Sequence, residues 1–330
     1  MGQLLECVPN FSEGQNNETI KAIAQAIRKI KGVELLHIDS GVAANRTVYT
    51  FVGKPFGVIE AAFQAIKVAS KLIDMRVQKG EHPRMGACDV CPLVPISGIS
   101  MDEVVELSNQ LAKRINNELN IPVYLYENSA QTSQRKHLAA IRNGEYEGLE
   151  QKMKLEEWKP DYGTDFNSKS GATILGARNF LIAYNFNLHT SDISIAKEIA
   201  ASIRESGKIK VDAEGNKVRI PGIFKDLKAI GWFIKDFGVA QVSCNFSNFR
   251  ETPLHEVMEA IEELAAKKGV KVTGSELIGL IPKEALLDAG MYFDTTETEE
   301  DKLINIAVKR LGLFDLSDFI PKSRIIDYMV

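Results

Sequence analysis

Apolar residues along the chain alternate between strand-like runs and the spacing of amphipathic helices. LLECVPNF near the N-terminus reads as a strand running into a polar loop, and isoleucines three to four positions apart follow from Asn17 until Gly32. Further strands are predicted at 33–38, 46–52 and 92–96, with a second helix through 58–73. This β-α-β-β-α-β order is typical of a ferredoxin-like fold, an antiparallel sheet with helices on one face.

The second half of the chain repeats the same order. Between the halves we expect a helix that starts at a Ser100–Glu103 capping box and an added strand at 122–126. The repeat comprises strands near 180–186, 229–233, 241–246 and 270–273, a helix that Asp192 could cap, and a helix that begins near Pro253. We therefore predict an α+β protein of two ferredoxin-like subdomains, residues 1–175 and 176–330, divided after the turn-rich stretch 158–171.

Composition supports two globular domains. The chain has 330 residues, 45% of them hydrophobic and 25% charged, which is enough for a sizeable core. Its formal charge of −4 argues against nucleic acid as the main partner. No basic N-terminal segment precedes an apolar run, and no run approaches the roughly 18 apolar residues of a membrane span. We expect a soluble cytoplasmic protein.

Four cysteines are present, at positions 7, 88, 91 and 244. Cys88 and Cys91 form a C-x-x-C, which could be a redox pair or half of a metal site. No second C-x-x-C and no clustered histidine completes a tetrahedral set. We therefore interpret the pair as small packing residues and expect neither a structural zinc nor a disulfide.

Among the five histidines, His82 is the strongest candidate for an acid–base residue. It lies in KGEHPRMGACDVCP, a segment without helix or strand period in which Gly80, Pro83 and Gly86 predict a tight turn. A histidine can take and give a proton near neutral pH, and loops are where scaffolds usually mount reactive groups. The alternative is a charged surface turn.

The other histidines have simpler interpretations. His37 lies inside an apolar strand and is expected to be structural, whereas His137 and His255 are expected on solvated helix surfaces. His189 ends a strand and stays undecided.

Further polar residues follow the predicted strands. CVPNFSEG places Asn10 and Glu13 after the first strand, and DSGVAANRTVYTF places Asp39 and Arg46 beside the second and third. If these loops meet at one sheet edge, Arg46 and Arg84 become candidates for a carboxylate-binding fork. Either could equally form a surface ion pair of little energetic value. Phosphate-loop, zinc-protease and serine-hydrolase motifs do not occur.

The sequence resembles a known family. CVPNFSEG, NRTVYTFVG, EHPRMGACDVCP, GARNFLIAYNFNL and GSELIGLIP occur in order along the whole chain. Together they look like the formiminotransferase domain of formiminotransferase-cyclodeaminase. We expect these residues to contain no cyclodeaminase domain, because the resemblance to the formiminotransferase domain takes up the whole chain. Cys88 stands where the family more often has leucine, which agrees with a packing role.

The resemblance implies two ferredoxin-like subdomains, a homodimer and a folate site between the halves. It implies transfer of a formimino group from N-formimino-L-glutamate to tetrahydrofolate, without a metal, and it identifies His82, in HPRMGA, as the catalytic residue. The implied folate segment is Gly163, Thr164, Asp165, Phe166, Asn167, Ser168, Lys169, Ser170, Gly171 and Ala172. Its glycines and final alanine match the family, whereas its middle departs from it.

The implied reaction needs a proton shuttle, because N5 of tetrahydrofolate loses a proton on attack and the glutamate nitrogen gains one on departure. We expect His82 to move this proton. Arg46, Arg84 and Lys169 are the candidates for binding substrate carboxylates.

The choice among nearby carboxylates stays open. Asp39, Glu13 or Asp89 is expected to orient His82 and to raise its pKa. Asn10, Asn185 and Asn245 are candidates for the pterin or for local turns. Three other functions stay open: an N-formylglutamate transferase, a non-catalytic folate-binding protein and, least favoured, an RNA-binding module.

Overall fold

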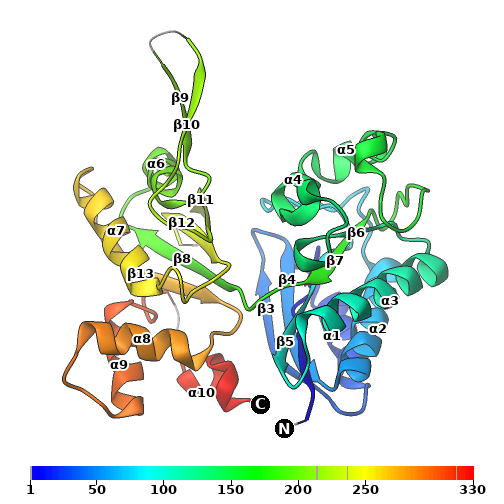
Figure 1. Ribbon diagram of the computed structural model, residues 1–330, viewed down its shortest axis with the longest axis horizontal. Helices are drawn as coiled ribbons and strands as arrows, with labels where there is room; N and C mark the ends of the chain where they lie inside the picture. Colours follow the sequence, from blue (N-terminus) through cyan, green and yellow to red (C-terminus); the bar gives the residue numbers. More distant parts are fainter. Residues whose placement is uncertain (1, 213–214, 236, 317) are drawn as a thin grey trace. The chain divides into compact units, whose positions relative to one another are not determined.

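A computed structural model describes residues 2–212, 215–235, 237–316 and 318–330. The chain forms two compact α/β units that meet in sequence at Asn179 and Phe180 (Figure 1). Among the described residues, no helix combines the length and the apolar character that a membrane crossing requires.

The first unit contains one seven-stranded sheet. Its strands are β1 (Leu4–Cys7), β2 (Asn10–Phe11), β3 (Val33–Gly41), β4 (Arg46–Gly53), β5 (Cys88–Ser97), β6 (Val123–Leu125) and β7 (Thr173–Ala177). Its main helices are α1 (Asn17–Arg28), α2 (Pro55–Leu72) and α3 (Met101–Leu119), and the shorter α4 (Leu138–Arg142) and α5 (Glu145–Lys152) follow β6. The predicted strands and helices of this half are present.

The order of strands places the first segment of the chain in the centre of this sheet. β1 pairs antiparallel with β4 on one side and β5 on the other, and β3 pairs with β4 outside them. The expected antiparallel arrangement holds for these strands but not for the whole sheet, since β7 runs parallel to both β5 and β6. The helix α3 between β5 and β6 reverses the chain, so that β6 runs in the direction of β5.

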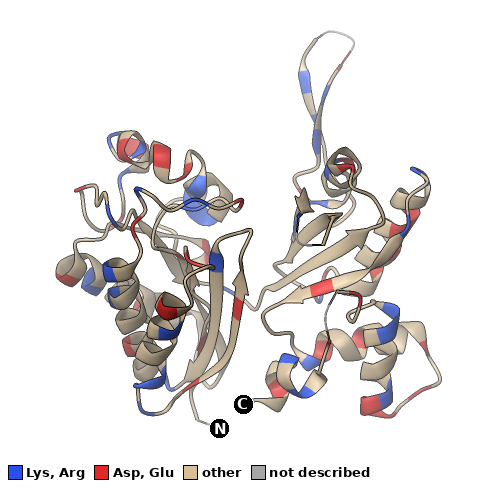
Figure 2. Ribbon diagram, turned by 180° about the vertical axis from the view of Figure 1, so that it is seen from behind, with Lys and Arg blue, Asp and Glu red and all other residues tan. Residues whose placement is uncertain are grey.

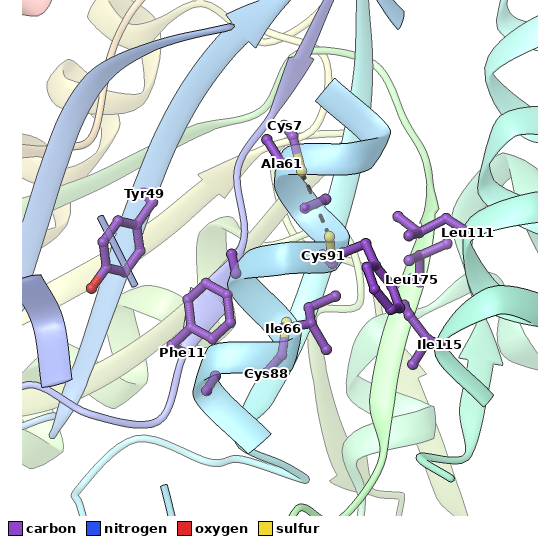
Figure 3. Close-up of a cluster of buried hydrophobic side chains, with 14 of the residues drawn as sticks. Cys7, Phe11, Tyr49, Ala61, Ile66, Cys88, Cys91, Leu111, Ile115 and Leu175 are labelled. Carbon is purple, nitrogen blue, oxygen red and sulfur yellow. Dashed lines mark hydrogen bonds between the residues drawn. The ribbon is translucent and has the colours of Figure 1, made fainter. Parts of the chain in front are cut away.

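Small side chains let α2 pack closely on this sheet. Figure 3 shows Cys7, Cys88 and Cys91 among apolar neighbours that include Ala61 and Ile66 of α2. The Sγ atoms of Cys7 and Cys91 are 3.6 Å apart, and all four cysteines are buried and free. Burial raises the pKa of the Cys7 and Cys88 thiols well above their usual range, so both stay uncharged. The C-x-x-C therefore packs as part of the core.

A bulge explains how both cysteines of this motif reach the same core. Asn10 of β2 is paired with Val90, but the next residue, Phe11, is paired with Cys88, so Asp89 is an extra residue in β5. A bulge re-aims side chains in the strand that carries it. Cys88 and Cys91 thus both join the apolar cluster, while Asp89 is directed to a polar one.

The second unit has a four-stranded antiparallel sheet in the order β11-β12-β8-β13. Its elements are β8 (Ile182–Leu188), α6 (Ile193–Ile203), β9 (Lys208–Val211), β10 (Lys217–Ile220), β11 (Leu227–Ile234), β12 (Val239–Phe246), α7 (Leu254–Ala266), β13 (Val272–Ile278), α8 (Lys283–Phe293), α9 (Glu300–Arg310) and α10 (Pro321–Arg324). Asp192 caps α6 as predicted, by accepting from the backbone of Ser194. The hairpin β9–β10, which carries several basic residues (Figure 2), and the helices after β13 were not predicted.

One histidine prediction is wrong in this unit. His255 lies on α7 but is only 6% exposed, and its ring stacks on that of Tyr292 at a centroid distance of 4.2 Å. The periodicity of α7 alone could not reveal this contact, because α8, which supplies Tyr292, covers this side of the helix.

Candidate active site

The loop between α2 and β5 carries His82 and is anchored from both ends. Asn45, a residue in the left-handed region with φ of 47°, holds the start of the loop by donating to the carbonyl of Lys79 at 2.6 Å. Ser12 holds its end by donating to the carbonyl of Gly86 at 2.7 Å. The turn predicted from glycine and proline is therefore braced by side chains from other loops.

His82 contacts a cation rather than a carboxylate. Its Nδ1 lies 2.5 Å from a terminal nitrogen of Arg46 and 2.8 Å from the carbonyl oxygen of Pro83. A guanidinium only donates, so contact with Arg46 requires an unprotonated Nδ1 and places the ring proton on Nε2. Donation from Nδ1 to Pro83 would instead leave Nε2 free as a base. The two contacts therefore require different tautomers of the ring.

Arg46 begins β4 and is almost fully buried, with 6% of its surface exposed. Besides His82, it donates to the Asn10 side chain at 2.9 Å and to the Pro83 carbonyl at 3.0 Å, and it pairs with Asp89 at 3.0 Å. Burial lowers the pKa of Arg46 to about 10, which still leaves it charged at neutral pH. These contacts suit a residue that holds His82 in place more than one that awaits a substrate carboxylate.

Asp89 balances two arginines. Its carboxylate is fully buried, accepts from the backbone of Met85 at 2.7 Å, and pairs with Arg46 and with Arg142 at 2.7 Å. Burial alone would raise its pKa, but Arg142 and Arg46 bring the pKa below its usual value. Asp89 is therefore an ionised bridge between the two guanidinium groups.

His82 is uncharged at neutral pH. Loss of surrounding water is the main cause, and Arg46 and Arg142 add to it, so that the pKa of His82 falls from 6.5 to about 3. Asp89 and the Pro83 carbonyl oppose this shift with smaller effects. Asp89 therefore acts on His82 in the expected direction, but loss of surrounding water and the two arginines outweigh it, so the pKa of His82 is lowered overall.

This shift predicts a pH dependence of stability. Between pH 6.5 and about 3, His82 takes a proton in the unfolded chain but not in the folded one, so its contribution to folding is complete above 6.5 and is lost as the pH falls. A His82→Gln variant should therefore lose less stability than wild type between pH 7 and pH 4. Urea unfolding of both proteins across this range measures the difference. Parallel curves would contradict the lowered pKa.

Arg84 lies in the same loop but in a separate network. Its Nε donates to the side chain of Gln78, and its terminal nitrogens donate to the Gln78 carbonyl and to Glu145 and Glu147 at 2.7–3.1 Å. All five of its N–H donors are used in this way. This arrangement ties the loop to α5 and leaves no donor for a substrate.

The sequence-derived carboxylates lie in different places. Glu13 accepts from the backbone of Gln15 and Asn16, both at 2.8 Å, and closes the turn before α1. Asp39 lies on β3, with its carboxylate 3.9 Å from His37. Asp89 belongs to the group around Arg46 and His82, which it joins through its ion pair with Arg46.

The segment 163–172 lies beside the loop of His82. The backbone of Ala87 donates to Ser170 at 2.8 Å, and Ala172 donates to Met85 at 3.2 Å. Gly171 has φ of 66°, and a Cβ there would lie 2.1 Å from the Met85 carbonyl oxygen, so this close approach requires glycine. Towards its other end Thr164 and Asp165 are exposed, and Lys169 donates to the carbonyl of Lys71 at 2.7 Å.

Sequence reasoning missed Arg142. It ends the short helix α4, where a basic residue is ordinary because it complements the helix dipole. Its partner Asp89 is 53 residues away in the sequence, so local pattern carries no signal for the contact.

No metal site accompanies this group in the part of the chain that the structure describes. Within residues 2–212, 215–235, 237–316 and 318–330, His, Cys, Asp and Glu side chains do not gather in groups of three or more that could hold an ion.

The site thus consists of His82, Arg46, Asp89 and Arg142, in and around a loop that is hydrogen-bonded to the glycine-bounded segment 163–172. Comparison with known families identifies the chain as a transferase. Residues 4–178 match the formiminotransferase domain, N-terminal subdomain, and residues 183–330 match the formiminotransferase domain. The chain belongs to the formiminotransferase family.

Individual relatives support this membership. The formimidoyltransferase-cyclodeaminases of Rattus norvegicus and Dictyostelium discoideum are 49% and 48% identical to all of this chain. The chain spans only 60% and 61% of their lengths. A glutamate formimidoyltransferase of Streptococcus pyogenes serotype M1 is 46% identical over 89% of this chain and 94% of its own length.

Proposed function

We propose that this protein is a glutamate formimidoyltransferase, which transfers the formimino group of N-formimino-L-glutamate to N5 of tetrahydrofolate. The observation that carries the proposal is the uncharged His82. Arg46 hydrogen-bonds its ring, and the loop that carries it is hydrogen-bonded through the backbone to segment 163–172. The names of the relatives, above all the glutamate formimidoyltransferase of matching length, support the same reaction.

In the proposed mechanism, N5 attacks the formimino carbon and a tetrahedral intermediate forms. His82 takes the proton that N5 loses, and it gives that proton to the glutamate nitrogen as the bond from carbon to this nitrogen breaks. The neutral ring has a free nitrogen that can take a proton, although burial and the nearby arginines oppose its protonation. Burial and the nearby arginines make the imidazolium short-lived, which favours rapid delivery to the leaving group.

The proposed tetrahydrofolate site includes residues 163–172. Its support is the family pattern together with the backbone bonds between this segment and residues 85–87, which place the segment next to the His82 loop. Asn10 contributes indirectly in this proposal, because its side chain accepts from Arg46. Tetrahydrofolate acts as a co-substrate.

The finer features of the protein are part of the same proposal. Each unit would be a ferredoxin-like subdomain, 1–175 and 176–330, supported by the central position of β1 and β8 in their sheets. The protein would be a cytoplasmic homodimer.

A donor comparison tests the function. Purified protein with tetrahydrofolate should turn over N-formiminoglutamate with a kcat/KM at least about tenfold above that for N-formylglutamate. Absorbance of the formimino product reports the rate. Preference for the formyl donor would establish the alternative transferase, and folate binding without turnover of either donor would establish a non-catalytic binding protein.

A further inference from the structure

The group around His82 holds one more positive than negative charge. Arg46 and Arg142 are cations and Asp89 is the anion that both contact, while His82 is neutral. Exposed fractions of these three side chains are 6% for Arg46, 14% for Arg142 and 0% for Asp89. A buried charge without a counter-charge is costly, so the group is complementary to an anionic ligand.

The two arginines differ in how many donors remain. Arg46 is bonded to His82, Pro83, Asn10 and Asp89. Arg142 has one partner, Asp89, and its Nε is buried without a hydrogen-bond partner among the described residues. Buried polar groups of folded proteins are normally satisfied, and an exception calls for an explanation. Of the two arginines, Arg142 is thus the one with N–H donors that remain available for a ligand.

We propose that Arg142 forms a carboxylate subsite, and that the α-carboxylate of the amino-acid donor is its ligand. This inference rests on the proposed function. In N-formiminoglutamate the α-carboxylate is three bonds from the carbon that is transferred. A cation in the same cluster as His82 is therefore suitably placed to bind this carboxylate. The carboxylates of a folate lie beyond its aminobenzoyl group, far from N5. A guanidinium also matches a carboxylate with two parallel hydrogen bonds.

Occupation of this subsite would also act on His82. Arg142 is one of the two cations that oppose protonation of the ring. A bound carboxylate would offset that field, so the ring would accept a proton more readily when the donor is present than when the site is empty. Arg142 is in this respect a substrate-binding residue whose ligand prepares the proton shuttle.

The test compares Arg142→Gln and Arg142→Lys with wild type and with Arg28→Gln, an exposed arginine at the end of α1. Arg142→Lys keeps a cation beside Asp89, which protects the fold, but it loses the two-pronged geometry. We expect KM for N-formiminoglutamate to rise about 10- to 100-fold in Arg142→Gln and less in Arg142→Lys. KM for tetrahydrofolate should change less than about twofold, and Arg28→Gln should match wild type.

A second acceptor separates the two sources of carboxylate. With a tetrahydropterin that lacks the benzoylglutamate tail, the rise in KM for N-formiminoglutamate should persist. If the rise appears in KM for tetrahydrofolate and disappears with the tail-less acceptor, the subsite belongs to the folate and the proposal is overturned. An unchanged donor KM in folded Arg142→Lys and Arg142→Gln overturns it as well.

Binding of the product L-glutamate distinguishes this inference from the proposed function. Titration calorimetry should show glutamate binding to wild type and to Arg28→Gln, and weaker binding to Arg142→Gln by at least about tenfold. This readout does not need turnover. If wild type shows no turnover but binds glutamate more tightly than Arg142→Gln, the proposed transferase function is refuted and the carboxylate subsite is supported. If wild type is active but its affinity for glutamate is unchanged in Arg142→Gln, the transferase function is supported and the subsite is refuted.

Discussion

Replacing His82 by alanine is expected to lower kcat by about 10² or more, because the chain would lose the group that, in the proposed mechanism, moves the proton between two nitrogens. Folding should survive the change. The ring is half-buried, and Arg46 keeps Asn10, Pro83 and Asp89 as partners after its removal. Affinity for tetrahydrofolate should stay close to that of wild type, since segment 163–172 is bonded to residues 85–87 through the backbone. Steady-state kinetics with saturating N-formiminoglutamate measure the loss.

His137→Ala is the matched control for this variant. His137 belongs to the same unit and is exposed before α4. Its replacement should leave kcat within about twofold of wild type. A folded His82→Ala protein with near-normal turnover would remove His82 from the mechanism and leave the non-catalytic folate-binding alternative in its place.

Replacing Asp89 by asparagine is expected to destabilise the first unit by about 3 kcal/mol or more, because removal of one partner from a buried ion pair leaves uncompensated charge. Both guanidinium groups of Arg46 and Arg142 would face an amide in place of the shared carboxylate. The amide nitrogen can only donate, as can both arginines, so at least one contact becomes repulsive. Such a loss is a large part of the 5–15 kcal/mol that typically separates folded from unfolded proteins.

Chemical unfolding in urea, followed by circular dichroism, measures this effect. Asp102→Asn, at an exposed position in the first turn of α3, should change stability by less than about 1 kcal/mol. Turnover of Asp89→Asn should also fall, because Asp89 fixes the arginine that touches His82. Equal stability of wild type and Asp89→Asn would mean that the carboxylate does not balance the two cations.

Secondary structure was largely predictable because the signals are local. Enrichment in β-branched and aromatic residues placed β4, isoleucine spacing placed α1, and the Ser100–Glu103 box was found at the start of α3 as expected. The parallel pairing of β7 was not predictable, since a strand does not encode its neighbour's direction. The burial of His255 likewise depends on Tyr292, a residue of another helix.

The candidate reacting residue could be named from sequence, but its environment could not. The turn residues around His82 and the HPRMGA motif both point to it. The charge state of the ring depends on Arg46 and Arg142, which are 36 residues before it and 60 residues after it in the printed sequence. The β-bulge at Asp89 aims the carboxylate at these arginines, and the register of a pair of strands is a tertiary property.

By itself, the sequence determined the repeated order of elements, membership of the formiminotransferase family and the place of His82 in a tight turn, because periodicity, turn residues and short motifs are read from neighbouring positions. Only the tertiary structure decided which charges surround that ring. It saturates Arg84 with Glu145 and Glu147, joins Asp89 to two arginines and brings Arg142 into the group. The physical reason is that a pKa responds to distances and burial in space, and chain separation does not report them.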